Sequence, residues 1–210
     1  MPLFSRDLEA LLQKYIDTLG VEGRHRLRAL LKNESVDTRY ELLMSVRGVK
    51  VSTWTGLHNG AVTNDLKSIR YMLGGFSFNQ KYDVVKIQDS DECTALHIAA
   101  SLGHTSIINS LFGNLPEDRI YYLLKMRNRN GDTPFHVAAT SNKVEAVQAI
   151  ISSVPSPLLK QLLSIMNKKG QIVKDIRPEL YNKLPALISQ GNVGLVLIYF
   201  LSFVNSLGRR

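Results

Sequence analysis

The sequence lacks most features that would support catalysis, metal binding or a disulfide-stabilised fold. Its single cysteine, Cys93, cannot form an internal disulfide, and its first residues lack the basic-then-apolar order of a secretory signal. These two absences favour an intracellular, cytoplasmic protein. The sequence contains no phosphate-binding glycine loop, no Ser-His-Asp context and no metal-ligand spacing. We therefore expect no enzymatic activity, no cofactor and no metal.

A long apolar run is also missing. The apolar stretch from Val193 to Val204 is shorter than the roughly 20 residues that a membrane-spanning helix needs. We prefer a buried capping helix for this stretch. A short membrane anchor followed by Arg209 and Arg210 remains the alternative.

The composition is that of a folded, basic protein. Hydrophobic residues make up 44% of the chain and charged residues 21%, which argues against disorder along its whole length. The net charge is +8, from 26 Lys and Arg against 18 Asp and Glu. This basic excess is compatible with an acidic protein, nucleic acid or an anionic membrane, and it says more about association than about the fold.

The chain repeats itself with a constant shift of 39 in residue number, the shift from Thr94 to Thr133. Residues 93–112 align with residues 132–151 in this way, and residues 54–73 align with residues 93–112. The linking segments 84–87, 123–126 and 162–165 recur in the same register. The recurring polar positions are Thr55, Thr94 and Thr133, and His58, His97 and His136. A period of this length indicates a stack of similar units.

Each unit has the signals of a helix pair. Thr94 and Thr133 are suited to cap a first helix, and Pro134 is suited to its first position. Gly103 and Asn142, with Asn64 in the first copy, tolerate the left-handed backbone that ends such a helix. We predict helices over 95–102, 105–113, 134–141 and 144–152, and short additional helices over 117–126 and 157–165.

The segment Thr133–Ala139 reads T-P-F-H-V-A-A, and Gly103 is followed by His104. These residues resemble the ankyrin repeat. The resemblance implies an all-α, helix-turn-helix solenoid with short hairpin loops that binds proteins, in which the recurring histidine forms hydrogen bonds within the turn. We predict a helical N-terminal cap over 1–48, ankyrin repeats over 49–176, and a helical C-terminal cap or apolar tail over 177–210.

The sequence departs from the family pattern in three respects. The period exceeds the usual value of about 33 residues, and the predicted additional helices account for the difference. Glu92 stands where the next copy has Gly131, and residues 50–55 of the first copy have no glycine before the threonine, so we expect distorted hairpin turns at both places. The first copy is degenerate, with Asn59 and Gly60 in place of an apolar residue and alanine.

The two ends of the array are less regular. Residues 167–171 predict a fourth hairpin. Two interpretations of the residues after it are open. Residues 173–180 begin a degenerate repeat, or they are an insertion and residues 184–203 supply the next helices. We prefer the insertion. Residues 7–19, 25–31 and 38–46 read as amphipathic helices that cover the N-terminal end of the solenoid.

The hairpin tips are the candidate binding residues, because their residues differ between copies, whereas the structural residues of the repeat recur. The recurring histidines are assigned to structure, since a metal site would need them to converge. The tips change from acidic to basic along the array and are Asp91, Glu92, Arg127, Arg129, Asn130, Lys168 and Lys169.

We therefore predict a monomeric scaffold or adaptor. It would bind an unidentified protein partner on its hairpin tips and inner helices. The alternatives are an ankyrin adaptor anchored to a membrane by the apolar C-terminal segment, and a binder of nucleic acid or another polyanion through the basic excess.

Overall fold

The computed structural model describes residues 34–45, 56–182 and 184, and these residues are mainly helical. Hairpin loops join the helices, and Gln88 and Thr94 form an isolated antiparallel bridge in one of them. The helices are α3 (Val36–Ser45), α4 (Gly56–Thr63), α5 (Leu66–Leu73), α6 (Phe78–Val85), α7 (Ala95–Leu102), α8 (Thr105–Phe112), α9 (Glu117–Lys125), α10 (Pro134–Thr140), α11 (Val144–Ser152), α12 (Ser156–Leu163) and α13 (Val173–Ile176). The predicted all-α class is confirmed.

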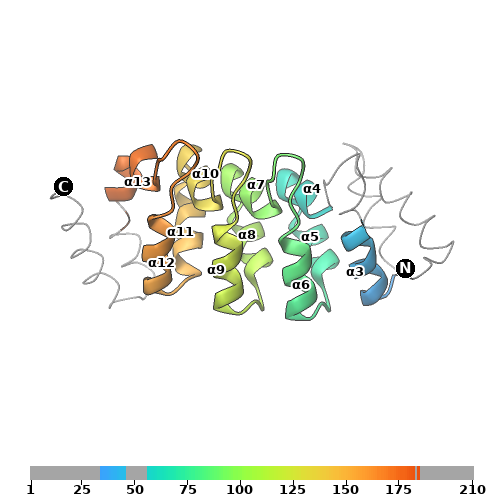
Figure 1. Ribbon diagram of the computed structural model, residues 1–210. Helices are drawn as coiled ribbons and strands as arrows, with labels where there is room; N and C mark the ends of the chain where they lie inside the picture. Colours follow the sequence, from blue (N-terminus) through green and yellow to red (C-terminus); the bar gives the residue numbers. More distant parts are fainter. Residues whose placement is uncertain (1–33, 46–55, 183, 185–210) are drawn as a thin grey trace.

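Each repeat unit contains three helices. The first helices α4, α7 and α10 pack on one another in a row, and the second helices α5, α8 and α11 form a parallel row beside them. The third helices α6, α9 and α12 form another row below the hairpin loops in Figure 1. The predicted helix pairs over 95–152 and both predicted additional helices are present, with bounds that differ by at most two residues.

The first helices begin at the predicted threonines. The hydroxyl of Thr94 accepts a hydrogen bond from the backbone N–H of His97, and Thr133 does the same for His136. These caps satisfy backbone donors that a helix start leaves unpaired. The corresponding Thr55 lies outside the described residues. The turns that follow have left-handed φ values of 55° at Asn64, 80° at Gly103 and 54° at Asn142, as the sequence predicts.

Small residues let the first helices approach closely. Ala99, Ala100, Ala138 and Ala139 are completely buried where α7 and α10 pack together. In α4, Gly60 occupies the equivalent of Ala99, and a Cβ atom there would lie 2.7 Å from Cδ1 of Ile69. A larger residue at this position of the degenerate first copy would therefore force the Ile69 side chain of α5 to move.

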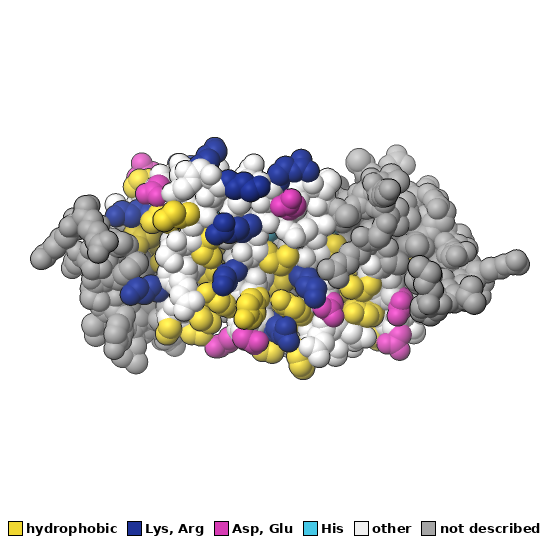
Figure 2. All heavy atoms as spheres, viewed as in Figure 1, with side chains coloured by type: hydrophobic (Ala, Val, Ile, Leu, Met, Phe, Trp, Pro, Cys, Tyr) yellow, Lys and Arg dark blue, Asp and Glu magenta, His cyan; other side chains and the backbone are white. Residues whose placement is uncertain are grey.

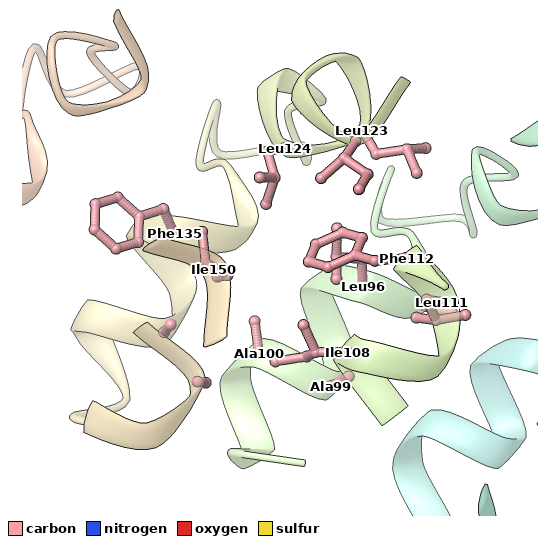
Figure 3. Packing of buried hydrophobic residues seen from close by; sticks show 14 of the residues in the cluster. Leu96, Ala99, Ala100, Ile108, Leu111, Phe112, Leu123, Leu124, Phe135 and Ile150 are labelled. Carbon is pink, nitrogen blue, oxygen red and sulfur yellow. The ribbon is translucent and has the colours of Figure 1, made fainter. Parts of the chain in front are cut away.

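The third helices account for the long period. Leu123 and Leu124 of α9 are 1% and 0% exposed. Both side chains point toward the second helix α8, which ends at Phe112 (Figure 3). The equivalent residues of α12, Leu162 and Leu163, are also buried. Burying each leucine stabilises the fold by roughly 1.5–3 kcal/mol. The third helix is thus an integral part of each unit's core.

Helix α3 occupies the place of a third helix. Arg39 of α3 and Lys81 of α6 are both buried, and each donates hydrogen bonds to carbonyl oxygens at the end of a second helix. The acceptors are Tyr71 and Gly74 for Arg39, and Ser110 and Gly113 for Lys81. These acceptor pairs stand at equivalent positions of successive units, so the two cations cap equivalent helix ends. The rest of the cap predicted over 1–48 is outside the described residues.

Replacing Lys81 by methionine should destabilise the protein by about 2–3 kcal/mol, because the change removes the charged hydrogen bonds to the carbonyls of Ser110 and Gly113. Burial lowers the pKa of Lys81 to about 8, so the ammonium group is still mostly protonated at neutral pH. Urea unfolding followed by circular dichroism measures the loss. The control Lys86→Met changes a lysine on the outer side of the same segment, and its effect should stay within about 0.5 kcal/mol. Equal losses in the two variants would contradict this role for Lys81.

The C-terminal end of the described array differs from the preferred reading of the sequence. Residues 173–180 are not an insertion, because α13 begins at Val173 and packs on α10 as the next first helix. Val173 occupies the position that Pro134 has in the preceding unit, and it is completely buried. The helix ends at Ile176, because Pro178 disfavours a helical conformation at Arg177, the residue before it. The segment from Val193 to Val204 lies outside the described residues.

Candidate partner-binding surface

The three described hairpins share one hydrogen-bonded frame. It is built on Asp89, Asn128 and Asn167, which occupy the same position in successive units. In each hairpin, the side-chain Oδ1 atom of this residue accepts the backbone N–H groups two and four positions later, at 2.8–3.0 Å. Its own N–H donates to the carbonyl oxygen four positions later, at 2.8–2.9 Å. Each tip is therefore held by a short side chain that folds back on its own loop.

The expected distortion at Glu92 is wrong, and the one expected over residues 50–55 lies outside the described residues. Glu92 has a φ of 61°, close to 76° at Gly131 and 72° at Gly170. Its N–H donates to the carbonyl oxygen of Asp89 at 3.0 Å, as Gly131 does to Asn128 at 2.8 Å. The shared frame therefore imposes a left-handed backbone on a residue that adopts it at an energetic cost.

Direct hydrogen bonds connect neighbouring hairpins. The N–H of Arg129 donates to the carbonyl of Asp91 at 2.9 Å, and the N–H of Lys168 donates to the carbonyl of Asn130 at 3.1 Å. The Arg129 guanidinium also lies 3.1 Å from the Asp91 carboxylate. These links set the three tips in register along one edge of the array.

All seven predicted binding residues are exposed. Two of the basic side chains interact with neighbouring tips, since Arg129 pairs with Asp91 and the Lys168 ammonium donates to the carbonyl of Arg129 at 2.6 Å. The side chains of Glu92, Arg127 and Lys169 have no ion-pair partner within the described part of the chain. The tips thus present a mixed row of acceptor and donor groups, with the cations mainly on the later hairpins.

The recurring histidines connect consecutive units beneath the tips. Nε2 of His58, His97 and His136 donates to the carbonyl oxygen of Cys93, Asp132 and Gln171, at 3.0, 3.1 and 3.3 Å respectively. Nδ1 of His97 and His136 accepts from the backbone N–H of the preceding capping threonine. An imidazole that accepts at Nδ1 and donates at Nε2 must be neutral. The family resemblance implied only the hydrogen bonds within the turn. The bond from Nε2 to the next hairpin was not predicted from the sequence.

Burial keeps these imidazoles neutral. The pKa of His97 is lowered to about 4, and the pKa values of His58 and His136 are also lowered, in each case mainly because burial penalises the charged form. The hairpins therefore rest on a row of neutral hydrogen-bonding side chains.

Comparison with protein-family models gives a match to ankyrin repeats in three copies over residues 57–161, which is half of the chain. The chain belongs to the ankyrin-repeat family. A search of the curated proteins finds no match. Ankyrin repeats are protein–protein interaction modules, and the matched residues cover α7, α10, nearly all of α4 and two of the three hairpins.

The first helices α4, α7 and α10 are the inner helices of the array. They expose apolar side chains that were not among the residues predicted from the sequence. Val62 of α4 is 41% exposed and Leu102 of α7 is 42% exposed. Ile98 and Val137, at equivalent positions of α7 and α10, are half-buried. These four residues lie on the side of their helices that faces away from the buried alanines, and the helical spacing in the sequence would have identified them. They add an apolar component to the polar tips of the binding surface.

Two other kinds of site are absent from the described residues. No group of His, Cys, Asp and Glu side chains there is arranged to hold a metal ion. None of the helices in the same ranges combines the length and the apolar character needed to cross a membrane.

Cys93 is half-buried, and burial together with the Asp89 carboxylate raises the pKa of its thiol. This environment disfavours the reactive thiolate.

Proposed function

We propose that the chain is a scaffold or adaptor that binds an elongated segment of another protein across its hairpin tips and inner helices. The observation that carries the proposal is the contrast between frame and tips. The hairpins repeat the same hydrogen bonds in successive units, while the exposed side chains on them differ. A rigid frame that presents different side chains in each unit is suited to recognising a specific partner.

The charge order gives the bound segment a direction. Its acidic part would meet Arg127, Lys168 and Lys169, and its basic part would meet Glu92. Arg129 and Asp91 pair with each other, but both side chains remain more than 60% exposed. A partner can therefore exchange this ion pair for its own charges at little cost. The exposed apolar residues Val62 and Leu102 would contact the apolar side chains of the same segment.

Reversing the basic tips should weaken binding strongly and change its salt dependence. The variant Arg127→Glu/Arg129→Glu/Lys168→Glu/Lys169→Glu changes exposed side chains, so the fold should be retained. We expect a loss of affinity of at least about 100-fold, since complementary charges set both attraction and orientation. The measurement is affinity capture from cell extract with wild-type protein, identification of the captured protein by mass spectrometry, and titration of the purified partner against both proteins.

The control reverses two basic residues on the second helix α5, with Lys67→Glu/Arg70→Glu, and is compared with the two-residue tip variant Lys168→Glu/Lys169→Glu, which should already weaken binding. The Lys67 and Arg70 side chains are exposed and lie away from the tips. This control should retain the partner. A folded tip variant that binds the purified partner with unchanged affinity would show that the hairpin row is not the binding site.

A further inference from the structure

The row of third helices has a surface of its own, formed by basic and aromatic side chains. We define the third-helix face as Tyr82, Lys86, Arg119, Tyr122 and Lys125, from α6, α9 and the residue after α6. Figure 2 shows Lys and Arg side chains from the hairpins down over these helices, with hydrophobic side chains between them. This face is separate from the inner helices that the proposed function uses.

The cations of this face are held against aromatic rings. The Arg119 guanidinium lies 4.8 Å from the centre of the Tyr82 ring, and the Lys86 ammonium lies 5.1 Å from it. The Lys125 ammonium lies 5.0 Å from the ring of Tyr121 and 6.0 Å from that of Tyr122. Such contacts contribute only about 0.5–1 kcal/mol each at exposed sites. They orient the charged groups on the surface more than they stabilise the fold.

The charges of the third-helix face are incompletely balanced. Asp83 forms an ion pair with Lys86, and Asp118 lies 3.8 Å from Arg119. Within the described residues, Lys125 has no carboxylate within 4.0 Å and donates no hydrogen bond. Tyr122 beside it is 54% exposed. The centre of the face therefore offers an uncompensated cation next to an accessible aromatic ring.

We propose that the third-helix face binds a short acidic segment of a protein. Carboxylates of the segment would contact Lys86, Arg119 and Lys125, and an apolar side chain would pack on Tyr122. Charge complementarity favours this ligand. Nucleic acid fits less well, because the two cations beside the Tyr82 ring compete with stacking bases for that ring.

The test uses the full chain and a fluorescein-labelled peptide in which glutamate alternates with serine and leucine. Fluorescence anisotropy measures its affinity for wild type and for Lys86→Gln/Lys125→Gln, which neutralises equivalent positions of two units. We expect a loss of about five- to tenfold and a weaker salt dependence in this variant. The matched control Lys67→Gln/Arg70→Gln removes the same charge from α5, including one residue in the last turn of that helix. It should bind like wild type.

Three outcomes would overturn the proposal. They are an unchanged affinity in the Lys86→Gln/Lys125→Gln variant, an equal loss in the α5 control, and tighter binding of a labelled single-stranded oligonucleotide than of the peptide. The hairpin variant Lys168→Glu/Lys169→Glu separates this site from the proposed function. It should keep the peptide affinity within about twofold, because screening limits the influence of more distant charges.

Discussion

Lowering the pH from about 7 to about 5 should destabilise the protein by about 2 kcal/mol through His97 alone. Unfolded His97 binds a proton near pH 6.5, whereas the folded imidazole has a pKa of about 4. Between these values the unfolded chain holds more protons than the folded one, so stability falls as the pH falls through this window. His58 and His136 act in the same direction, since their pKa values are also lowered. Urea unfolding at the two pH values measures the change.

The variant His97→Gln should be less stable than wild type at neutral pH but less sensitive to acid. Glutamine at this position can still accept from the backbone N–H of Thr94, as Gln80 accepts from Ser77, but it lacks the rigid ring that joins this bond to the donation to Asp132. The link to the next hairpin is therefore weakened. Glutamine also cannot take up a proton, so the His97 share of the acid effect disappears. If wild type and variant lose the same free energy of unfolding between the two pH values, His97 is not the group responsible.

Replacing Gly131 by alanine should destabilise the protein by roughly 3 kcal/mol or more. Gly131 has a φ of 76°, and a Cβ atom there would lie 2.7 Å from the backbone nitrogen of Lys168. That nitrogen donates to Asn130 and links the second and third described hairpins. The alanine would therefore add a steric clash to the backbone strain and disturb the register of the tips. Thermal unfolding and urea unfolding measure the loss.

The chain provides two matched controls for Gly131→Ala. Gly170 has a φ of 72°, but nothing lies within 4 Å of the position of its Cβ atom. Gly170→Ala should therefore cost only about 1–2 kcal/mol, from backbone strain alone. Glu92→Gly removes the strain at the equivalent turn and should raise stability by up to about 1 kcal/mol. Equal losses for the two alanine variants would show that the contact with Lys168 contributes nothing.

Local signals explain why much of the fold was predictable. The caps at Thr94 and Thr133, the turns at Gly103 and Asn142, and the helical spacing of apolar residues all act within a few positions. Their recurrence from unit to unit makes each signal visible in several copies. The exposure of the hairpin-tip residues was predictable in the same way, because these positions vary inside a repeated hairpin. The prediction failed after residue 172, where the short α13 preserves the register but only Val173 and Ile176 preserve the apolar pattern.

The sequence by itself determined the repeat, the helices within each unit and the positions of the hairpin tips, because these depend on interactions between residues close in the chain. The tertiary structure decided which groups meet across units. The bonds from His97 to Asp132 and from Lys81 to Ser110, and the ion pair between Arg129 and Asp91, join residues at least 29 positions apart. Each forms only when neighbouring units stack and align their helix ends and hairpins, which is a consequence of packing that no local pattern encodes.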